Sequence, residues 1–133
     1  MIEEQTRTAA QPLRYTRIDS TPAGGSRFIE AEIPLAERVL AAGVPAMAVG
    51  GLSSAAGVSF LRSGGFDSEP HPAPARQWVV LLRGVLEVTA SDGDRRRFSP
   101  GDLLFVTDTE GRGHTTVAVG EGPFEALFIP EGA

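Results

Sequence analysis

The sequence predicts an all-β fold, a barrel or sandwich built from short antiparallel strands. From Gly57 onward, short apolar or alternating segments follow one another and are separated by Gly, Pro and Asp-Gly at intervals of about ten residues. No helical pattern of three turns occurs in this part of the chain. The 133 residues, 41% of them hydrophobic, suffice for one domain around one core. Closing such strands into a barrel removes unpaired edges, so we expect a single barrel domain over residues 13–133.

The N-terminal segment predicts a tail followed by two strands. Residues 1–12 show no periodicity and are expected to be flexible. Arg14–Asp19 and Arg27–Leu35 then predict two short strands, because they are rich in strand-forming residues and a turn rich in Pro and Gly separates them.

The segment Ala36–Ala56 is rich in Ala, Val, Leu and Gly. We expect a helical turn over Ala36–Ala42, because Gly43 and Pro45 prevent a longer helix. An exposed apolar segment of this length is uncommon on a monomer, so other parts of the protein or a partner should bury it. It is therefore expected to wrap over the barrel or to contact a neighbouring subunit.

Four further features complete the strand prediction. Val58–Arg62 predicts the first strand of the regular half, and Trp78–Leu82 is a continuous apolar run suited to burial on both faces. Gly84 permits a bend into the alternating segment Val85–Ala90, so the two form one long bent strand. Asp92-Gly93 predicts a hairpin. The remaining strands are expected at Arg95–Phe98, Leu103–Val106, Thr115–Val119 and Phe124–Ile129, with a turn at Pro100-Gly101-Asp102.

Composition excludes several classes of function. The chain has no cysteine, which removes disulfides, thiolate metal sites and a cysteine nucleophile. A net charge of −5 without any lysine argues against nucleic acid as a partner. The cluster Arg95-Arg96-Arg97 is interpreted as a solvated strand edge or, alternatively, an anion or partner site. No signal peptide and no apolar run long enough for a membrane span is evident, so we expect a cytoplasmic protein without membrane contact.

Four residues have the spacing of the first sequence motif of the cupins. Five residues separate Gly65 from His71, and six residues separate Gln77 from Gly84. The turn Pro100-Gly101-Asp102 resembles the turn that follows in the same family. The resemblance covers roughly half of the chain, with its motifs between residues 65 and 114. It implies a jelly-roll barrel, also called a double-stranded β-helix.

The family's usual site implies a divalent metal held by three His and one Glu, and this chain departs from that set. Ala73 replaces one His, Gln77 replaces the Glu, and Arg112 stands at the position of the last His. His114 follows two residues later, and the loop before it is expected to absorb that offset. The cofactor is therefore predicted to be either none or a divalent metal, bound by His71, His114 and Gln77.

The segments His71–Gln77 and Asp108–His114 also resemble a subset of small bacterial cupins, which implies that Gln77 belongs to a shared pattern. Within the loop, Asp108 and Glu110 are interpreted as a mobile lip over the barrel mouth or as an ordinary solvated turn. Trp78 is interpreted as core or as a pocket wall, and Arg76 as a partner for an acidic ligand or as an outward-facing residue.

The leading functional hypothesis is an enzyme that performs acid-base chemistry on a metabolite inside the barrel, such as isomerisation, cyclisation or dehydration. His71 and His114, the only two histidines, are the predicted catalytic residues, with Gln77 as their hydrogen-bond partner. Arg76, Trp78 and Glu69 are predicted to contact the ligand.

Two alternatives stay open: a non-catalytic module that binds a metabolite, and a metal-dependent oxygenase or isomerase of the usual cupin kind. The resemblance further implies a homodimer, and the arginine-rich composition suggests secondary metabolism.

Overall fold

The computed structural model describes residues 11–133, and within them all regular structure is β-strand. The all-β prediction is therefore confirmed. The tail predicted over residues 1–12 lies outside the described part, apart from its last two residues. Contacts divide the chain into two compact units, a larger one of Tyr15–Ala31 and Ser53–Ala133 and a smaller one that contains Glu32–Leu52. No helix in the described part is long and apolar enough to cross a membrane.

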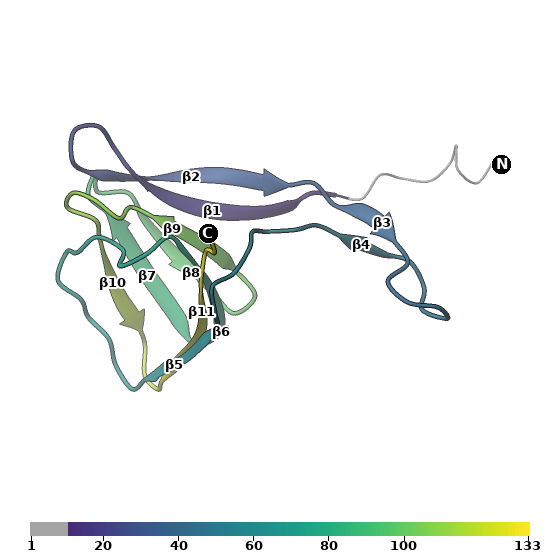
Figure 1. The fold of residues 1–133 in the computed structure, drawn as a ribbon. Helices are drawn as coiled ribbons and strands as arrows, with labels where there is room; N and C mark the ends of the chain where they lie inside the picture. The colour runs from purple at the N-terminus through teal and green to yellow at the C-terminus, as the bar shows by residue number, and fades with distance from the viewer. Residues whose placement is uncertain (1–10) are drawn as a thin grey trace. The chain divides into compact units, whose positions relative to one another are not determined.

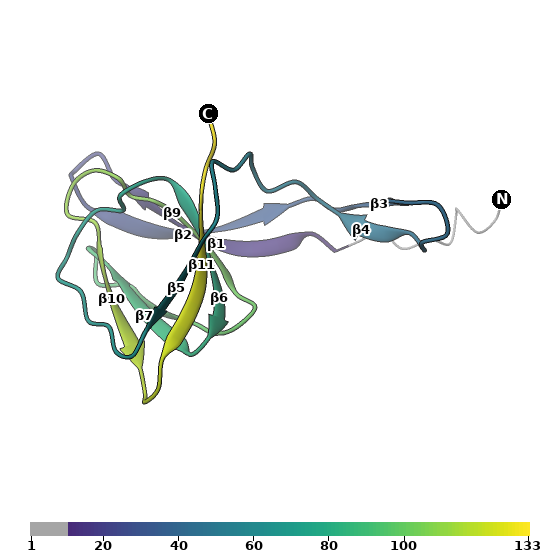
Figure 2. The same ribbon diagram turned by 60° about the horizontal axis from the view of Figure 1, so that its bottom comes forward.

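Two sheets face each other in the larger unit (Figures 1 and 2). The six-stranded sheet has the order β2-β1-β9-β6-β11-β5, and the three-stranded sheet has the order β10-β7-β8. The first sheet is formed by β1 (Leu13–Ser20), β2 (Ser26–Ile33), β5 (Ser59–Ser63), β6 (Gln77–Arg83), β9 (Leu103–Thr107) and β11 (Phe124–Pro130). The second is formed by β7 (Val85–Ala90), β8 (Arg95–Phe98) and β10 (His114–Val119).

The core lies between these sheets because alternate residues of each strand point inward. Leu81 and Leu104 from the larger sheet pack in one cluster with Leu86 and Val88 from the smaller sheet. Gly84 has a positive φ of 85° and connects β6 with β7, so the predicted bent strand is confirmed and contributes one half to each sheet.

The other strands predicted in this unit are also confirmed, with ends that differ by at most two residues. The hairpin at Asp92-Gly93 forms as expected, since the amide of Gly93 donates to the carbonyl of Ala90 and Gly93 has a φ of 93°. The predicted turn at Pro100-Gly101-Asp102 is closed by a hydrogen bond from the amide of Asp102 to the carbonyl of Ser99.

The smaller unit contains a hairpin, and the helical turn predicted over Ala36–Ala42 is wrong. β3 (Ala36–Arg38) pairs antiparallel with β4 (Met47–Val49). The chain reverses between them where the amide of Val44 donates to the carbonyl of Ala41 and Gly43 adopts a φ of 82°. Pairing between the two short strands thus prevails over the weak helical preference of the segment.

Candidate functional site

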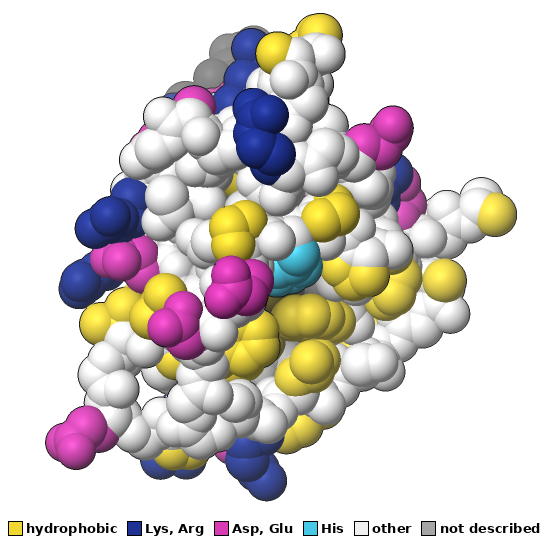
Figure 3. All heavy atoms as spheres, turned by 90° about the vertical axis from the view of Figure 1, so that its left-hand side faces the viewer, with side chains coloured by type: hydrophobic (Ala, Val, Ile, Leu, Met, Phe, Trp, Pro, Cys, Tyr) yellow, Lys and Arg dark blue, Asp and Glu magenta, His cyan; other side chains and the backbone are white. Residues whose placement is uncertain are grey.

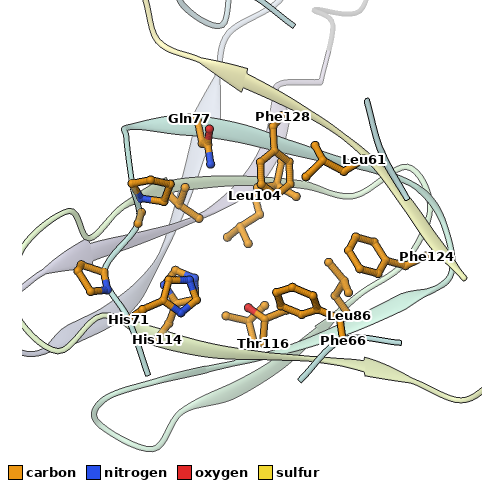
Figure 4. Close-up of a pocket in the computed structure, with 16 residues that line it drawn as sticks. Leu61, Phe66, His71, Gln77, Leu86, Leu104, His114, Thr116, Phe124 and Phe128 are labelled. Carbon is orange, nitrogen blue, oxygen red and sulfur yellow. The ribbon is translucent and has the colours of Figure 1, made fainter. Parts of the chain in front are cut away.

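A cavity of about 290 Å³ lies between the two sheets of the larger unit (Figure 4). Its walls are largely apolar, and its polar side chains are His71, Gln77, His114 and Thr116. No Arg, Lys, Asp or Glu is among the described residues that line it. In the space-filling view, a histidine borders a hollow surrounded by hydrophobic side chains, with acidic side chains beside it (Figure 3). The apolar lining consists of Leu61, Phe66, Pro72, Ala73, Pro74, Val79, Leu86, Val88, Leu104, Val106, Phe124 and Phe128.

Main-chain pairing places the two histidines side by side. The segment before His71 runs along β10, and the amide of Ser68 donates to the carbonyl of Thr116 at 2.9 Å. At its end, His71 and His114 exchange two main-chain hydrogen bonds of 3.1 and 3.0 Å. Their ring centroids lie 5.2 Å apart with the planes at 48°. Both imidazoles therefore border the same part of the cavity (Figure 4).

His114 is held by a buried carboxylate. Its Nδ1 lies 2.5 Å from Oδ2 of Asp108, and the two residues are 8% and 0% exposed. Because a carboxylate oxygen accepts, Nδ1 carries the proton, and Nε2 is left for chemistry in the cavity. Oδ1 of Asp108 is buried and has no hydrogen-bond partner in the described part of the chain. The interpretation of Asp108 as part of a lip or solvated turn is therefore wrong, since this carboxylate is fully enclosed.

The loop between β9 and β10 is fixed by close backbone contacts. The carbonyl of Asp108 accepts from the amide of Ala73 at 2.9 Å. Gly113 has a φ of 71°, and a Cβ there would lie 1.9 Å from the carbonyl oxygen of His71. Only glycine fits such an approach. These contacts hold Asp108 within hydrogen-bond distance of His114. Glu110 of the same loop is exposed, as expected for a solvated turn.

His71 is oriented by the main chain. Its Nδ1 lies 2.9 Å from the carbonyl oxygen of Glu69, and a carbonyl can only accept, so Nδ1 is protonated, while Nε2 has no hydrogen-bond partner among residues 11–133. The side chain of Glu69 is exposed and does not line the cavity. Its predicted contact with a ligand has no support from this geometry.

Gln77 lies across the cavity from the histidines (Figure 4). It is the first residue of β6 and is 6% exposed, and its side chain makes no hydrogen bond with any other described residue. Its amide is not among the fully enclosed unpaired atoms of the described residues, so it opens to the cavity, where a ligand or water can satisfy it. The three residues predicted to be catalytic thus line one cavity, but the predicted hydrogen bond between Gln77 and the histidines does not form, because Glu69 and Asp108 occupy Nδ1 of the two rings.

Arg76 and Trp78 do not line this cavity, because adjacent residues of a strand point to opposite faces. Arg76 forms an ion pair with Glu131 at 2.7 Å. Trp78 stacks on Phe105 with centroids 4.4 Å apart and donates its Nε1 hydrogen to Ser53 Oγ at 2.9 Å. Trp78 is therefore buried on the face of the six-stranded sheet that points away from the cavity.

A polar pocket of about 410 Å³ is lined by Arg17, Asp19, Ser20, Arg76 and Thr107. Burial acts to raise the pKa of Asp19, but hydrogen bonds from Arg17 and Thr107 outweigh it and hold this pKa below its ordinary value. The same hydrogen bond with Asp19 raises the pKa of Arg17. Both charges are therefore satisfied within the protein.

The donor set does not fit the metal that the sequence resemblance implies. Described residues contain no cluster of three or more His, Cys, Asp or Glu able to hold a metal ion. The cavity offers the Nε2 atoms of His71 and His114 and the weakly ligating amide of Gln77. Asp108 is already bound to Nδ1 of His114. A stable site requires three or four converging good donors, which the described residues around this cavity do not provide.

Solved structures that resemble this chain include two with the following similarity. A Cupin 2 conserved barrel domain protein from Salinispora arenicola CNS-205 has 19% sequence identity and a TM-score of 0.48, with 76% of each chain covered. A putative ethanolamine utilization protein q from Salmonella typhimurium LT2 has 13% identity and a TM-score of 0.44, with 93% of this chain and 98% of that chain covered.

A search of curated proteins finds no match to this chain. The family model Cupin_2, described as Cupin domain, matches residues 58–130. This range extends from the residue before β5 to the end of β11 and includes every described residue that lines the cavity. The fold class predicted from the sequence, a cupin barrel, is confirmed. Because the match covers more than half of the 133 residues, the chain belongs to the cupin domain family.

Proposed function

We propose that this cupin is an enzyme that transfers a proton within a small metabolite bound in the cavity, with His114 as the general base and acid. The observation that carries the proposal is the buried pair of Asp108 and His114. The carboxylate fixes the imidazole orientation and tautomer, and it stabilises the imidazolium that forms when Nε2 accepts a proton.

The other polar side chains supply the remaining roles. In a substrate with a carbonyl group, Nε2 of His114 removes a proton from the adjacent carbon, and the electron pair moves to the carbonyl oxygen. The amide of Gln77 donates a hydrogen bond to that oxygen as its negative charge develops. His71, with its free Nε2, lies close enough to exchange a proton with the same substrate.

Three outcomes of the resulting enolate match the predicted reaction classes. In a substrate with a C=C bond conjugated to the enolate, return of the proton from the His114 imidazolium to the far end of that bond gives isomerisation, because the double bond moves with the electron pair. Loss of a neighbouring hydroxyl as water, with the imidazolium proton leaving on it, gives dehydration. Attack of the enolate carbon on a second carbonyl of the same molecule, with that oxygen taking the proton, gives cyclisation. Each route restores neutral His114.

The test follows proton exchange and requires no knowledge of the product. Wild-type protein is incubated in D₂O with a panel of small ketones, and exchange of deuterium for hydrogen beside the carbonyl is followed by NMR. We expect His114→Ala to abolish enzyme-dependent exchange, while Arg76→Ala, a control on the other face of the sheet, retains it. Unchanged exchange in His114→Ala would overturn the proposal.

A second candidate is a non-catalytic module that holds a metabolite, and the largely apolar, uncharged lining favours it. Binding and turnover separate the two candidates. An enzyme loses far more turnover than affinity in His114→Ala, whereas a binding module shows no exchange in any variant.

We also propose that the chemistry proceeds without a metal, because the donors around the cavity are too few. Elemental analysis after purification without chelator tests this, and stoichiometric metal would favour the metal-dependent alternative instead. The cytoplasmic location, the homodimer and the link to secondary metabolism stay predictions from the sequence.

A further inference from the structure

We infer that the ligand of the cavity is an uncharged carbonyl compound with one compact apolar ring. The assignment of its carbonyl group rests on the proposed function, whereas its size and charge follow from the cavity alone.

The volume sets the size. The cavity measures about 290 Å³. If each non-hydrogen atom occupies about 30 Å³, as a water molecule does in the liquid, there is room for roughly ten such atoms. That number suits a single ring with a short substituent.

The lining sets the charge. No described residue that lines the cavity is an Arg, Lys, Asp or Glu, and the nearby carboxylate of Asp108 is paired with His114. A charged ligand would lose its hydration without gaining a fixed counter-charge, which is strongly unfavourable in an apolar enclosure. An uncharged molecule avoids this loss.

The arrangement of polar groups sets the position of the carbonyl. The Gln77 side chain is 6% exposed, its amide has no protein partner among the described residues, and it lies across the cavity from the imidazoles of His71 and His114 (Figure 4). Its N–H groups are therefore available to a ligand, and a carbonyl oxygen between the two walls would accept from them while the adjacent carbon lies near Nε2 of His114.

The opposite part of the cavity suits a ring. Phe66, Phe124 and Phe128 line it, and the rings of Phe66 and Phe124 meet edge to face with centroids 5.8 Å apart and planes at 82°. Such aromatic walls favour another flat ring through edge and face contacts. Phe66 is 41% exposed and therefore lies between the cavity and solvent.

Three probes of matched size test the inference: acetophenone, benzoate and cumene, which have the same number of non-hydrogen atoms. Dissociation constants are measured by NMR titration of wild type and Gln77→Leu, with Arg76→Leu as a control on the outer face. We expect acetophenone to bind at least about tenfold more tightly than either other probe, the effect of one buried hydrogen bond or one unpaired charge. In Gln77→Leu its advantage over cumene should disappear.

Equal or tighter binding of benzoate would overturn the uncharged assignment, and an unchanged preference in Gln77→Leu would overturn the carbonyl assignment. Because binding is measured without turnover, the two proposals fail separately. Acetophenone preference without any proton exchange would sustain the ligand class and overturn the enzyme. Proton exchange combined with preference for benzoate would sustain the enzyme and overturn the ligand class.

Discussion

Replacing Asp108 with Asn tests the buried acid-base pair while keeping the size of the side chain. The asparagine would present an amide to Nδ1 of His114 in place of a carboxylate. Where the amide N–H donates, Nδ1 must accept, so the imidazole adopts the other tautomer and Nε2 carries the proton. A protonated, neutral Nε2 cannot remove a proton from the substrate.

The size of the effect follows from the geometry. The Asp108 carboxylate is the single side chain among the described residues that hydrogen-bonds to His114, and both groups are nearly excluded from solvent. A positioned general base typically contributes about 10²–10⁴-fold to rate. We expect Asp108→Asn to lower proton exchange by that factor while the dissociation constant for acetophenone changes by less than about threefold, because Asp108 does not line the cavity.

NMR of the His114 ring separates a loss of its correct tautomer from a general loss of folding in the variant. The ¹⁵N shifts of His114 report which ring nitrogen carries the proton, and they should exchange their values in Asp108→Asn. Thermal unfolding is the control, and we expect a melting temperature within a few degrees of wild type. Full proton exchange in the variant, or an unchanged tautomer together with lost exchange, would refute the assigned role.

Four further outcomes are expected. Gly113→Ala combines a positive φ with a carbon 1.9 Å from a carbonyl oxygen, so thermal unfolding should show a loss above about 2 kcal/mol. The lowered pKa of Asp19 means that its ionised form favours the folded state. The ionised carboxylate therefore contributes its full stabilisation above the ordinary pKa of 3.8, and this contribution is lost as the pH falls through the lower pKa of the folded protein. Asp19→Asn should thus lose about 1 kcal/mol in urea at pH 7, and this difference should vanish in acid. Ala73→His with Gln77→Glu adds two donors to the cavity and should bind zinc stoichiometrically in elemental analysis, unlike wild type. Leu40→Asp in the hairpin of the smaller unit should lower dimer content in light scattering, because Leu40 is 55% exposed and isolated two-stranded hairpins are marginally stable; monomeric wild type would contradict the predicted homodimer.

The strands of the larger unit could be predicted because their signals are local. Alternation within a strand and the Asp92-Gly93 turn depend on a few adjacent residues, and they act the same way in any context. The hairpin of β3 and β4 was not predicted, since strands of three residues are too short to show alternation. Its formation depends on pairing between residues about ten positions apart.

Part of the site could also be predicted from local sequence signals. Motif spacing identified His71 and Gln77, and His114 was predicted from a place two residues beyond the motif position; all three line one cavity. Arg76 and Trp78 were expected to contact the ligand, yet strand alternation already implies that the neighbours of an inward-facing Gln77 point outward. That signal was available in the sequence.

Asp108 was missed because its burial is a tertiary effect. An acidic residue next to Gly-rich sequence is usually solvated, and the contacts that enclose it come from Ala73 and from the close approach of Gly113 to His71. One sequence signal did exist: Asp108 directly follows the apolar strand β9, where a side chain is still close to the core.

The substitutions that remove the metal donors also account for the cavity. Ala73 stands where the family pattern has a histidine, and Gln77 where it has a glutamate, and both side chains line the cavity beside His71 and His114. The small side chain of Ala73 leaves volume for a ligand, while the amide of Gln77 offers a donor that a carboxylate lacks. In the proposed proton transfer, Gln77 stabilises the developing negative charge on the substrate oxygen, and Asp108 stabilises the imidazolium of His114. The two departures from the family pattern serve that proposal in different ways, because Ala73 leaves room for the ligand and Gln77 offers it a hydrogen-bond donor.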